Sequence, residues 1–332
     1  MTVRFGILGA AGITPSALIA PAHANPDVEL VAVAARNRSR AEEFAAEHGV
    51  AQVLDSYDDL LASPDVDAVY IPLPNSAHAE WTVRAARAGK HVLVEKPYAS
   101  NAEEARRVVD AVAGLPVVVM EAFHYRHHPL IHRAEQLLAE GAIGDVVSAE
   151  AVFDIHLPDR TNIRYNWDLA GGSTMDLGCY SIHLLRTLLR SEPRVVSAEA
   201  RRVDGGQIDE ALTAHLEFPG GIRAVASSSL LEDAERQSAV VTGTRGSIAI
   251  EGFVKPHGGN SLTLTVDGHS TTEEVAPDVT SYGAQLAAFV AAVEEGGPVV
   301  VDSADSIATM EVIDACYRAA GLEPRRAVPW SL

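Results

Sequence analysis

Cysteine is scarce in this chain of 332 residues, which contains only Cys179 and Cys316. These two residues are far apart and form no CxxC pair. A disulfide framework or a thiolate zinc site needs more cysteines at closer spacing, so the sequence argues against both. Such cysteine usage fits a reducing compartment, and we expect a cytoplasmic protein.

Basic residues are also in short supply. Lysine and arginine together number 26, against 45 aspartate and glutamate residues, which gives a formal net charge of −19. Affinity for nucleic acid depends largely on neutralising phosphates, so this balance argues against a protein that binds a duplex, and we expect no nucleic-acid partner. A local basic pocket for a single small phosphate is still compatible with it.

Long apolar runs are missing as well. No stretch reaches the roughly 18 residues that a membrane helix needs. Met1 leads directly into an apolar run at Val3, without the basic segment and apolar core of a secretory signal. We therefore expect no membrane partner. The length and the 47% hydrophobic content suffice for two domains with buried cores.

The first third of the chain alternates short apolar runs with helical patterns. The apolar runs occupy residues 3–8, 30–35, 68–71, 91–94 and 116–120. The clearest helical patterns between them cover residues 14–24, 77–88 and 102–113. Strands that alternate with helices build a parallel sheet with right-handed crossovers. The sequence therefore predicts an α/β fold that begins with a Rossmann-type parallel sheet.

The loop after the first expected strand carries part of a dinucleotide-binding fingerprint. The pattern G-x-G-x-x-G would place glycines where this chain has Gly9, Ala11 and Thr14. Alanine at the second position still allows a fairly close approach to a pyrophosphate, and a helix start follows to supply N–H groups. A tight turn without function would look similar, but the position after the first strand favours nucleotide binding.

The end of the second expected strand distinguishes between the two nicotinamide cofactors. An NAD site usually has an acid there for the ribose 2′-hydroxyl, whereas an arginine accommodates the 2′-phosphate of NADP. This chain has Ala34-Ala35-Arg36-Asn37-Arg38, with two arginines and no acid. The sequence therefore favours NADP, with Arg36 near the phosphate, and leaves NAD as the alternative.

The chain beyond about residue 122 predicts a different kind of sheet. Apolar or alternating runs occupy residues 146–154, 195–203, 212–218, 223–230, 239–242, 247–251 and 262–266. Short turns connect several of them, such as Gly205-Gly206, Pro219-Gly220-Gly221 and Thr244-Arg245-Gly246. Such turns are typical of an antiparallel sheet, which leaves one face available to a partner. Two helices, at about 281–294 and 303–320, follow this sheet.

A helical pattern in the middle of the chain carries polar residues on one face. Gly171-Gly172-Ser173-Thr174 provides a flexible entry and a candidate cap for a helix at about 174–189. The residues at spacings i, i+4 and i+7 of that helix share one face, and they are Asp176, Tyr180 and His183.

Lys96 stands at the end of another expected strand, where open α/β sheets bind their ligands. Oxidising an alcohol needs a base for the hydroxyl proton while a hydride leaves for the nicotinamide, and reduction needs the reverse. Free tyrosine titrates near ~10 and free lysine near ~10.4, but a nearby ammonium favours the tyrosinate. We expect Tyr180 to exchange the proton and Lys96 to polarise the substrate oxygen, with Asp176 as an orienting group. The reverse assignment, in which Lys96 carries the proton, stays open.

Five short motifs together form a recognisable series. They are Gly6-Ile7-Leu8-Gly9-Ala10-Ala11, Pro74-Asn75 with His78, Glu95-Lys96-Pro97, Glu121-Ala122-Phe123, and Gly171-Gly172 with Asp176-Leu177-Gly178-x-Tyr180. With this series the chain closely resembles the Gfo/Idh/MocA oxidoreductase family over nearly its whole length. The most similar branch contains glucose–fructose oxidoreductase, xylose dehydrogenase, dihydrodiol dehydrogenase and sugar ketoreductases.

The resemblance implies two domains. Residues 1–121 would form the dinucleotide-binding Rossmann domain, and residues 122–332 a C-terminal α/β domain for substrate binding and oligomerisation. That second domain would contain a large, mostly antiparallel, open-faced sheet. In this family the sheet often builds a dimer interface, so we expect a homodimer or a homotetramer.

The motifs and the expected strand ends together give the candidate binding residues. For the cofactor they are Gly9, Ala11, Gly12, Ile13, Arg36, Asn37, Pro74, Asn75, His78, Glu95 and Lys96. For the substrate they are Lys96, Tyr125, Arg126, Asp176, Tyr180 and His183. The cluster of His124, His127 and His128 lacks a cysteine or an acid at ligand spacing, so we expect no metal.

The function that these residues predict is hydride transfer between NAD(P) and a secondary alcohol or ketone of a sugar, cyclitol or related polyol. Two alternatives within the same chemistry are a dihydrodiol dehydrogenase and a nucleotide-sugar ketoreductase. A dinucleotide-sensing regulator on the same fold is an alternative without catalysis. Any one of Lys96, Asp176 and Tyr180 alone has an ordinary structural explanation, but a sensor would need no such set.

Overall fold

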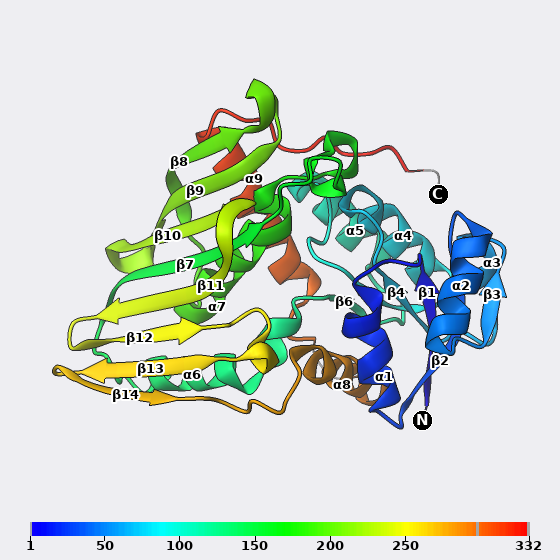
Figure 1. Cartoon of the computed structure of the whole chain (residues 1–332), viewed down its shortest axis with the longest axis horizontal. Helices are drawn as coiled ribbons and strands as arrows, with labels where there is room; N and C mark the ends of the chain where they lie inside the picture. Colours follow the sequence, from blue (N-terminus) through cyan, green and yellow to red (C-terminus); the bar gives the residue numbers. More distant parts are fainter. Residues whose placement is uncertain (1, 297–298, 331–332) are drawn as a thin grey trace. The chain divides into compact units, whose positions relative to one another are not determined.

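The computed structural model describes residues 2–296 and 299–330, and its contacts divide them into two compact units (Figure 1). The first unit contains residues 2–123, 282–296, 299–307 and 327–330. The second contains residues 124–281 and 308–326. No helix in the described part of the chain is long and apolar enough to cross a membrane.

A six-stranded parallel sheet organises the first unit. Its strands are β1 (Val3–Leu8), β2 (Val28–Ala34), β3 (Gln52–Leu54), β4 (Ala68–Ile71), β5 (His91–Val94) and β6 (Val119–Glu121). Their spatial order is β3-β2-β1-β4-β5-β6, and every neighbouring pair is parallel. This is the strand order of a dinucleotide-binding Rossmann sheet, whose order reverses between β1 and β4.

Helices connect these strands, as the sequence predicts. They are α1 (Ala20–His23), which follows a π-helical turn at Pro15–Ile19, α2 (Arg38–His48), α3 (Tyr57–Ala62), α4 (Asn75–Arg87) and α5 (Ala102–Val112). The ends of α2 have clear local causes. The side chain of Asn37 accepts a hydrogen bond from the backbone N–H of Arg40 at the start, and Gly49 adopts a left-handed conformation at the end.

The core of the first unit includes a segment from late in the chain. Helix α8 (Ser281–Glu295) places Phe289 against Phe5 of β1, with ring centroids 5.5 Å apart. Both rings are fully buried in one hydrophobic cluster with residues from β2, β4 and β5. The hydrophobic core against the parallel sheet is therefore completed by residues that follow the second sheet in the sequence.

An eight-stranded sheet organises the second unit. Its strands are β7 (Val146–His156), β8 (Arg194–Arg202), β9 (Asp209–Phe218), β10 (Ile222–Ser229), β11 (Leu231–Gly243), β12 (Gly246–Glu251), β13 (Ser261–Val266) and β14 (His269–Glu273). The spatial order is β14-β13-β12-β11-β7-β10-β9-β8. Strands β7 and β10 form the one parallel pair in this sheet, and the other neighbours are antiparallel.

Within residues 2–296 and 299–330, the helices that pack on this sheet lie on one of its faces. Helix α6 (Pro129–Ala139) and helix α7 (Cys179–Leu189) lie on the same side of it (Figure 1), and α7 contacts β7 and β10. Helix α9 (Ser303–Ala319) begins in the first unit and continues in the second. Alternation along β7 buries Ala149 and Ala151 and exposes Glu150, as expected for a sheet covered on one side. The predicted fold class, a Rossmann sheet and a mostly antiparallel open-faced sheet, is confirmed.

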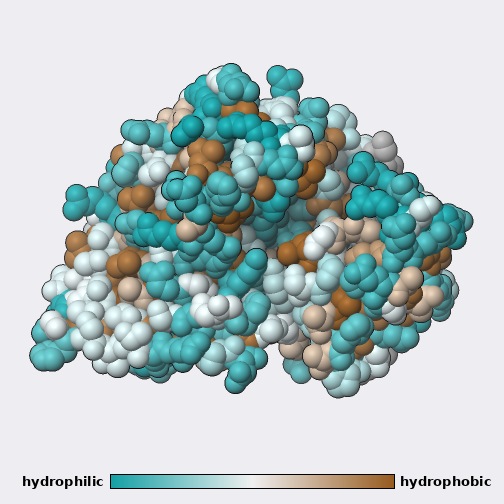
Figure 2. Space-filling view, viewed as in Figure 1, coloured by the Kyte–Doolittle hydropathy of each residue, from teal (hydrophilic) through white to brown (hydrophobic). Residues whose placement is uncertain are grey.

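The uncovered face changes in character from one end of the sheet to the other. In Figure 2 the surface over β13 and β14 is mostly pale, in keeping with their serine and threonine side chains. Towards β8 and β11 brown atoms lie among teal ones, and Val196 and Val240 are exposed there. This part of the face therefore mixes apolar and charged side chains.

Candidate active site

The first half of the candidate site lies at the carboxyl edge of the parallel sheet, where the strand order reverses. Gly9 follows β1 and donates its N–H to the carbonyl of Ala34 at 2.7 Å. Its φ of +109° lies in the region that favours glycine, and a Cβ there would sit 3.0 Å from a methyl group of Leu73. The loop continues through exposed Gly12 and Ile13 into the π-helical turn. In Rossmann folds, a dinucleotide phosphate binds at a tight turn of this kind, at the point where the strand order reverses.

The two arginines after β2 have different surroundings. Arg38 forms ion pairs with Glu42, at 2.8 Å, and with Asp55. Arg36 is exposed and, within residues 2–296 and 299–330, forms no ion pair with an acid. Two acids of the same chain already balance the charge of Arg38. Arg36 is therefore the better placed of the two to bind a phosphate.

A third arginine, which the sequence does not single out, reaches the glycine loop. Arg40 donates from its guanidinium to the carbonyl oxygen of Ala10 at 3.3 Å. The predicted cofactor residue Asn37 acts locally, because its side chain caps α2. In the sequence, Arg40 resembles any solvent-exposed residue in the first turn of a helix. Its contact with the glycine loop can be recognised only in the folded structure.

His78 holds together the two loops that follow β4 and β5. Its Nδ1 lies 2.7 Å from the carbonyl oxygen of Pro97, and its Nε2 lies 2.7 Å from that of Leu73. Burial lowers the pKa of His78 to about 4, against the opposing effect of these two carbonyl oxygens. His78 is thus a buried side chain that contacts the backbone of both loops, next to a cis Lys96–Pro97 bond.

Two buried carboxylates support the same loop. Glu95 accepts a hydrogen bond from the hydroxyl of Tyr70 at 2.6 Å, and Glu121 accepts one from the backbone N–H of Tyr98 at 2.8 Å. Lys96 itself is half-buried, as are Pro74 and Asn75 at the start of α4. The acids at the ends of β5 and β6 therefore fix the backbone around Lys96.

In the second unit, the glycine pair before α7 has a specific packing role. The N–H of Gly172 donates to the carbonyl of Arg164 at 2.7 Å, and a Cβ on Gly171 would lie 2.5 Å from the same oxygen. Gly172 has a φ of +126°, which also favours glycine. The pair therefore allows the loop after β7 to bring Arg164 close to the turn that leads into α7.

The helical segment that contains α7 is capped at its N-terminus by a residue of β9. It begins with a π-helical turn at Thr174–Gly178, and Ser173 makes no capping hydrogen bond with its side chain. Instead the buried carboxylate of Asp209, on β9, accepts from both the N–H and the hydroxyl of Thr174, each at 2.7 Å. The proposed cap within Gly171-Gly172-Ser173-Thr174 is thus wrong, because a carboxylate from β9 takes the acceptor's role.

Arg164 pairs with the predicted residue Asp176. Its guanidinium binds the Asp176 carboxylate, and this pairing raises the pKa of Arg164. The Tyr180 phenol also interacts electrostatically with Arg164. Within this unit, the ion pair of Arg164 and Asp176 therefore lies beside Tyr180. The sequence analysis predicts Asp176 as a site residue but not Arg164.

Tyr180 lies in a buried aromatic cluster. Its ring is 5.6 Å from that of Phe153 on β7 and 5.8 Å from that of Tyr125. Its hydroxyl oxygen is 3.1 Å from Nε2 of His124. His183, one turn further along α7, bonds through Nδ1 to the Tyr125 hydroxyl. The structure thus brings the predicted residues Tyr125, Tyr180 and His183 together with His124.

Two further residues of this segment lie in different surroundings. Arg126 forms a two-point ion pair with Glu135 of α6, at 2.9 and 3.1 Å. His127 is buried, which lowers its pKa to about 4. In the part of the chain that the structure describes, no group of three or more histidine, cysteine, aspartate or glutamate side chains could hold a metal ion.

Comparisons with known proteins agree with this geometry. The model of the Gfo/Idh/MocA oxidoreductase family, NAD-binding Rossmann fold, matches residues 3–123, and the model of the C-terminal domain of the same family matches residues 131–249. The chain is 41% identical to D-xylose 1-dehydrogenase (NADP(+)) 2 of Haloferax volcanii, over 96% of this chain and 97% of that protein. It is 36% identical to dTDP-3,4-didehydro-2,6-dideoxy-alpha-D-glucose 3-reductase of Streptomyces violaceoruber, over 96% of each.

A solved structure is similar over the same length. The crystal structure of KijD10, a 3-ketoreductase from Actinomadura kijaniata in complex with NADP and TDP-benzene, matches with a TM-score of 0.89 and 30% sequence identity. The match covers 96% of this chain and 98% of that protein.

Proposed function

Because the chain belongs to the Gfo/Idh/MocA oxidoreductase family and is an NAD(P)-dependent oxidoreductase, we propose the following activity for it. It transfers a hydride between NADP and a secondary alcohol or ketone carbon of a sugar or related polyol. Residues 1–121 bind the cofactor, and residues 122–332 bind the substrate and mediate self-association. The buried, unbridged state of both cysteines supports a cytoplasmic location.

The proposed preference for NADP over NAD rests on the arginines beside the glycine loop. Arg36 has no acidic partner among the described residues, Arg40 contacts the loop itself, and no acid stands at the end of β2. Gly9 supplies the tight turn that lets a pyrophosphate approach the backbone. The names of the Haloferax volcanii and Actinomadura kijaniata relatives point to the same cofactor. The residues present therefore fit NADP.

Exchanging the charge at Arg36 tests this preference. Arg36→Asp should weaken NADP binding by about tenfold to a hundredfold, the range expected for losing a hydrogen bond to a charged group, and leave NAD binding within a few fold. Arg38→Asp is the matched control, since Arg38 is already paired with Glu42 and Asp55. Dissociation constants of NADPH and NADH, from the fluorescence of the reduced nicotinamide, measure both effects. Equal losses for NADP and NAD in Arg36→Asp would refute the role in 2′-phosphate binding.

For the reaction, the bound nicotinamide supplies or accepts a hydride at C4. We assign the proton to Tyr180, whose hydroxyl gives it to the substrate oxygen in reduction and whose phenolate takes it in oxidation. Lys96 polarises the same oxygen and stabilises negative charge on it. Asp176, held by Arg164, orients the substrate's neighbouring hydroxyl group. The half-buried position of Lys96 on a braced loop supports its assignment.

A screen of substrates tests the activity. The purified protein should reduce NADP⁺ or oxidise NADPH with members of a panel of aldoses, cyclitols and ketosugars, followed by absorbance. The similarity to D-xylose 1-dehydrogenase favours aldoses as the substrate class. The similarity to dTDP-sugar 3-reductases supports a nucleotide-sugar ketoreductase as the second candidate, so a dTDP-ketohexose belongs in the panel. Tight NADP binding without turnover of any member would favour the sensor alternative instead.

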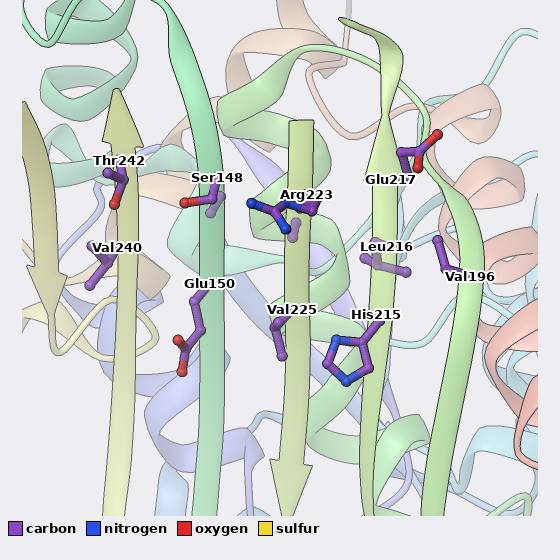
Figure 3. Close-up of a pocket in the computed structure, with 12 residues that line it drawn as sticks. Ser148, Glu150, Val196, His215, Leu216, Glu217, Arg223, Val225, Val240 and Thr242 are labelled. Atoms are coloured by element: carbon purple, nitrogen blue, oxygen red, sulfur yellow. The ribbon is translucent and has the colours of Figure 1, made fainter. Parts of the chain in front are cut away.

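We further propose that two copies of the chain associate through the uncovered face of the eight-stranded sheet. Figure 3 shows side chains of five strands in rows on this face, around a shallow cavity of about 460 Å³. One row contains Val240, Glu150, Val225 and His215. A twofold interface must be complementary to itself, and a face that mixes valines with charges of both signs meets that need.

Placing a charge in the middle of this row tests the association. Val225→Glu should convert the dimer, or a tetramer built from it, to a smaller species, because an unpaired carboxylate would be buried opposite its own copy. Multi-angle light scattering measures the mass. Val300→Glu is the control, since Val300 is 54% exposed and lies outside the sheet. A monomeric wild type, or a Val225→Glu protein with unchanged mass, would contradict the proposal.

A further inference from the structure

We propose that His124 is a positioning residue for Tyr180, and this inference rests on the proposed function. Its imidazole holds the phenol oxygen and, through its tautomer, directs the hydroxyl proton of Tyr180 away from itself towards the substrate. His124 comes from the short helical turn His124–His127, and Tyr180 from α7.

Both ring nitrogens of the His124 imidazole have a hydrogen-bonding partner. Nε2 lies 3.1 Å from the hydroxyl oxygen of Tyr180, and Nδ1 lies 2.9 Å from the hydroxyl oxygen of Ser281. The rings of His124 and Tyr180 meet edge to face, with centroids 5.9 Å apart. All three side chains are at least 96% buried, so little water competes for these hydrogen bonds.

The Ser281 hydroxyl decides which nitrogen carries the proton. A neutral imidazole has one N–H donor and one acceptor, and a serine hydroxyl can serve either. When Ser281 donates to Nδ1, Nε2 carries the hydrogen and donates it to the Tyr180 oxygen. The phenol proton then has no acceptor in His124 and points elsewhere. This tautomer also supplies a hydrogen bond to the phenolate, which accepts but does not donate.

The proton balance of the reaction follows from this arrangement. In reduction, the O–H bond of Tyr180 breaks as an O–H bond forms on the substrate, and the carbonyl carbon receives the hydride from the nicotinamide. The phenolate that remains keeps the hydrogen bond from Nε2 of His124. Oxidation reverses each step. His124 changes no covalent bond, so it acts only through Tyr180.

Other ionisable groups of the same unit also face Tyr180. The Arg164–Asp176 pair interacts with its phenol, and the ring of Tyr125, bonded to His183, packs against it. Phe153 of β7 also packs against the ring of Tyr180 and is apolar. Arg164 favours the phenolate by charge, whereas His124 makes a direct hydrogen bond to the oxygen. Removing His124 therefore leaves the charge in place and tests the hydrogen bond alone.

Two substitutions at residue 124 separate positioning from packing. His124→Leu removes the hydrogen bond and keeps an apolar side chain, while His124→Gln retains an amide N–H that reaches a similar position. We expect His124→Leu to lower kcat by about tenfold to a hundredfold, with KM for NADPH unchanged, and His124→Gln to recover most of it. For oxidation, the acid limb of the plot of kcat against pH should move to higher pH in His124→Leu. The reason is that the Tyr180 phenolate loses a hydrogen-bond donor, which raises the pKa of the phenol. Ser281→Ala should move it in the same direction by less.

A titration that needs no turnover separates this inference from the proposed function. The ultraviolet difference between each protein and its Tyr180→Phe counterpart follows the ionisation of Tyr180 alone. A raised midpoint in His124→Leu, with recovery in His124→Gln, supports the positioning role even where no substrate is turned over. Unchanged midpoints in His124→Leu and Ser281→Ala would overturn it. An active wild type whose pH profile is unaffected by His124→Leu would also overturn it, while leaving the proposed function intact.

Discussion

Lys96→Met should lower turnover by about a hundredfold to ten-thousandfold, the range that positioned proton and charge-stabilising groups contribute. Methionine keeps the length of the lysine's carbon stem, with sulfur in place of Cδ, and lacks the ammonium, so the substrate oxygen loses the cation that stabilises its negative charge. The loop itself should stay in place, since His78, Glu95 and Glu121 brace it independently of the lysine amine. Steady-state kinetics with the best substrate of the panel measure the loss.

The affinity for NADP should change by no more than a few fold in Lys96→Met, because the arginines near the glycine loop provide the charge for the phosphate. Lys255→Met is the matched control, since Lys255 is exposed and belongs to a loop of the other unit. Turnover that is unchanged in Lys96→Met would remove the lysine from the mechanism.

Tyr180→Phe should lower kcat by about a hundredfold or more, since the substituted residue can neither donate nor accept the proton. The fold should be unaffected, because the ring contacts with Phe153 and Tyr125 remain. Tyr125→Phe is the matched control, because it removes a hydroxyl group from a neighbouring tyrosine of the same aromatic cluster. Its hydroxyl bonds His183, and the loss of one neutral hydrogen bond corresponds to roughly tenfold at most. If the two variants lost activity equally, the proton role of Tyr180 would be contradicted.

The Rossmann half of the fold could be predicted from the sequence because its signals are local. Each strand and its crossover helix are neighbours in the chain, and the predicted strands at 68–71 and 91–94 coincide with β4 and β5. The predicted family, enzyme class and cofactor class are confirmed by the family models over residues 3–123 and 131–249 and by the relatives.

Contacts between distant segments of the chain could not be predicted in the same way. The packing of Phe289 on Phe5 joins α8 to β1, and nothing in either segment indicates the other. The parallel pairing of β7 with β10 likewise departs from the hairpin turns that the sequence shows. Strand β14 (His269–Glu273) escapes prediction because all five of its side chains are polar and exposed.

The candidate site shows the same division. Lys96, Asp176 and Tyr180 stand in motifs, so the sequence reveals them, although their roles stay predictions. Arg164 lies in a short 3₁₀ turn, Ile163–Tyr165, and becomes significant only through its pairing with Asp176. His124 is part of a histidine-rich segment, but its contact with Tyr180 spans 56 residues and depends on how that segment meets α7. Specific partners, unlike residue types, are a property of the folded chain.

The central claim is that Lys96 and Tyr180 act on one and the same substrate oxygen. Kinetics of the wild type, Lys96→Met, Tyr180→Phe and the double variant test it most directly. Groups that act as a unit give strongly non-additive losses, so we predict that the double variant is about as slow as the slower single variant. A double variant whose loss equals the product of the two single losses would contradict the claim.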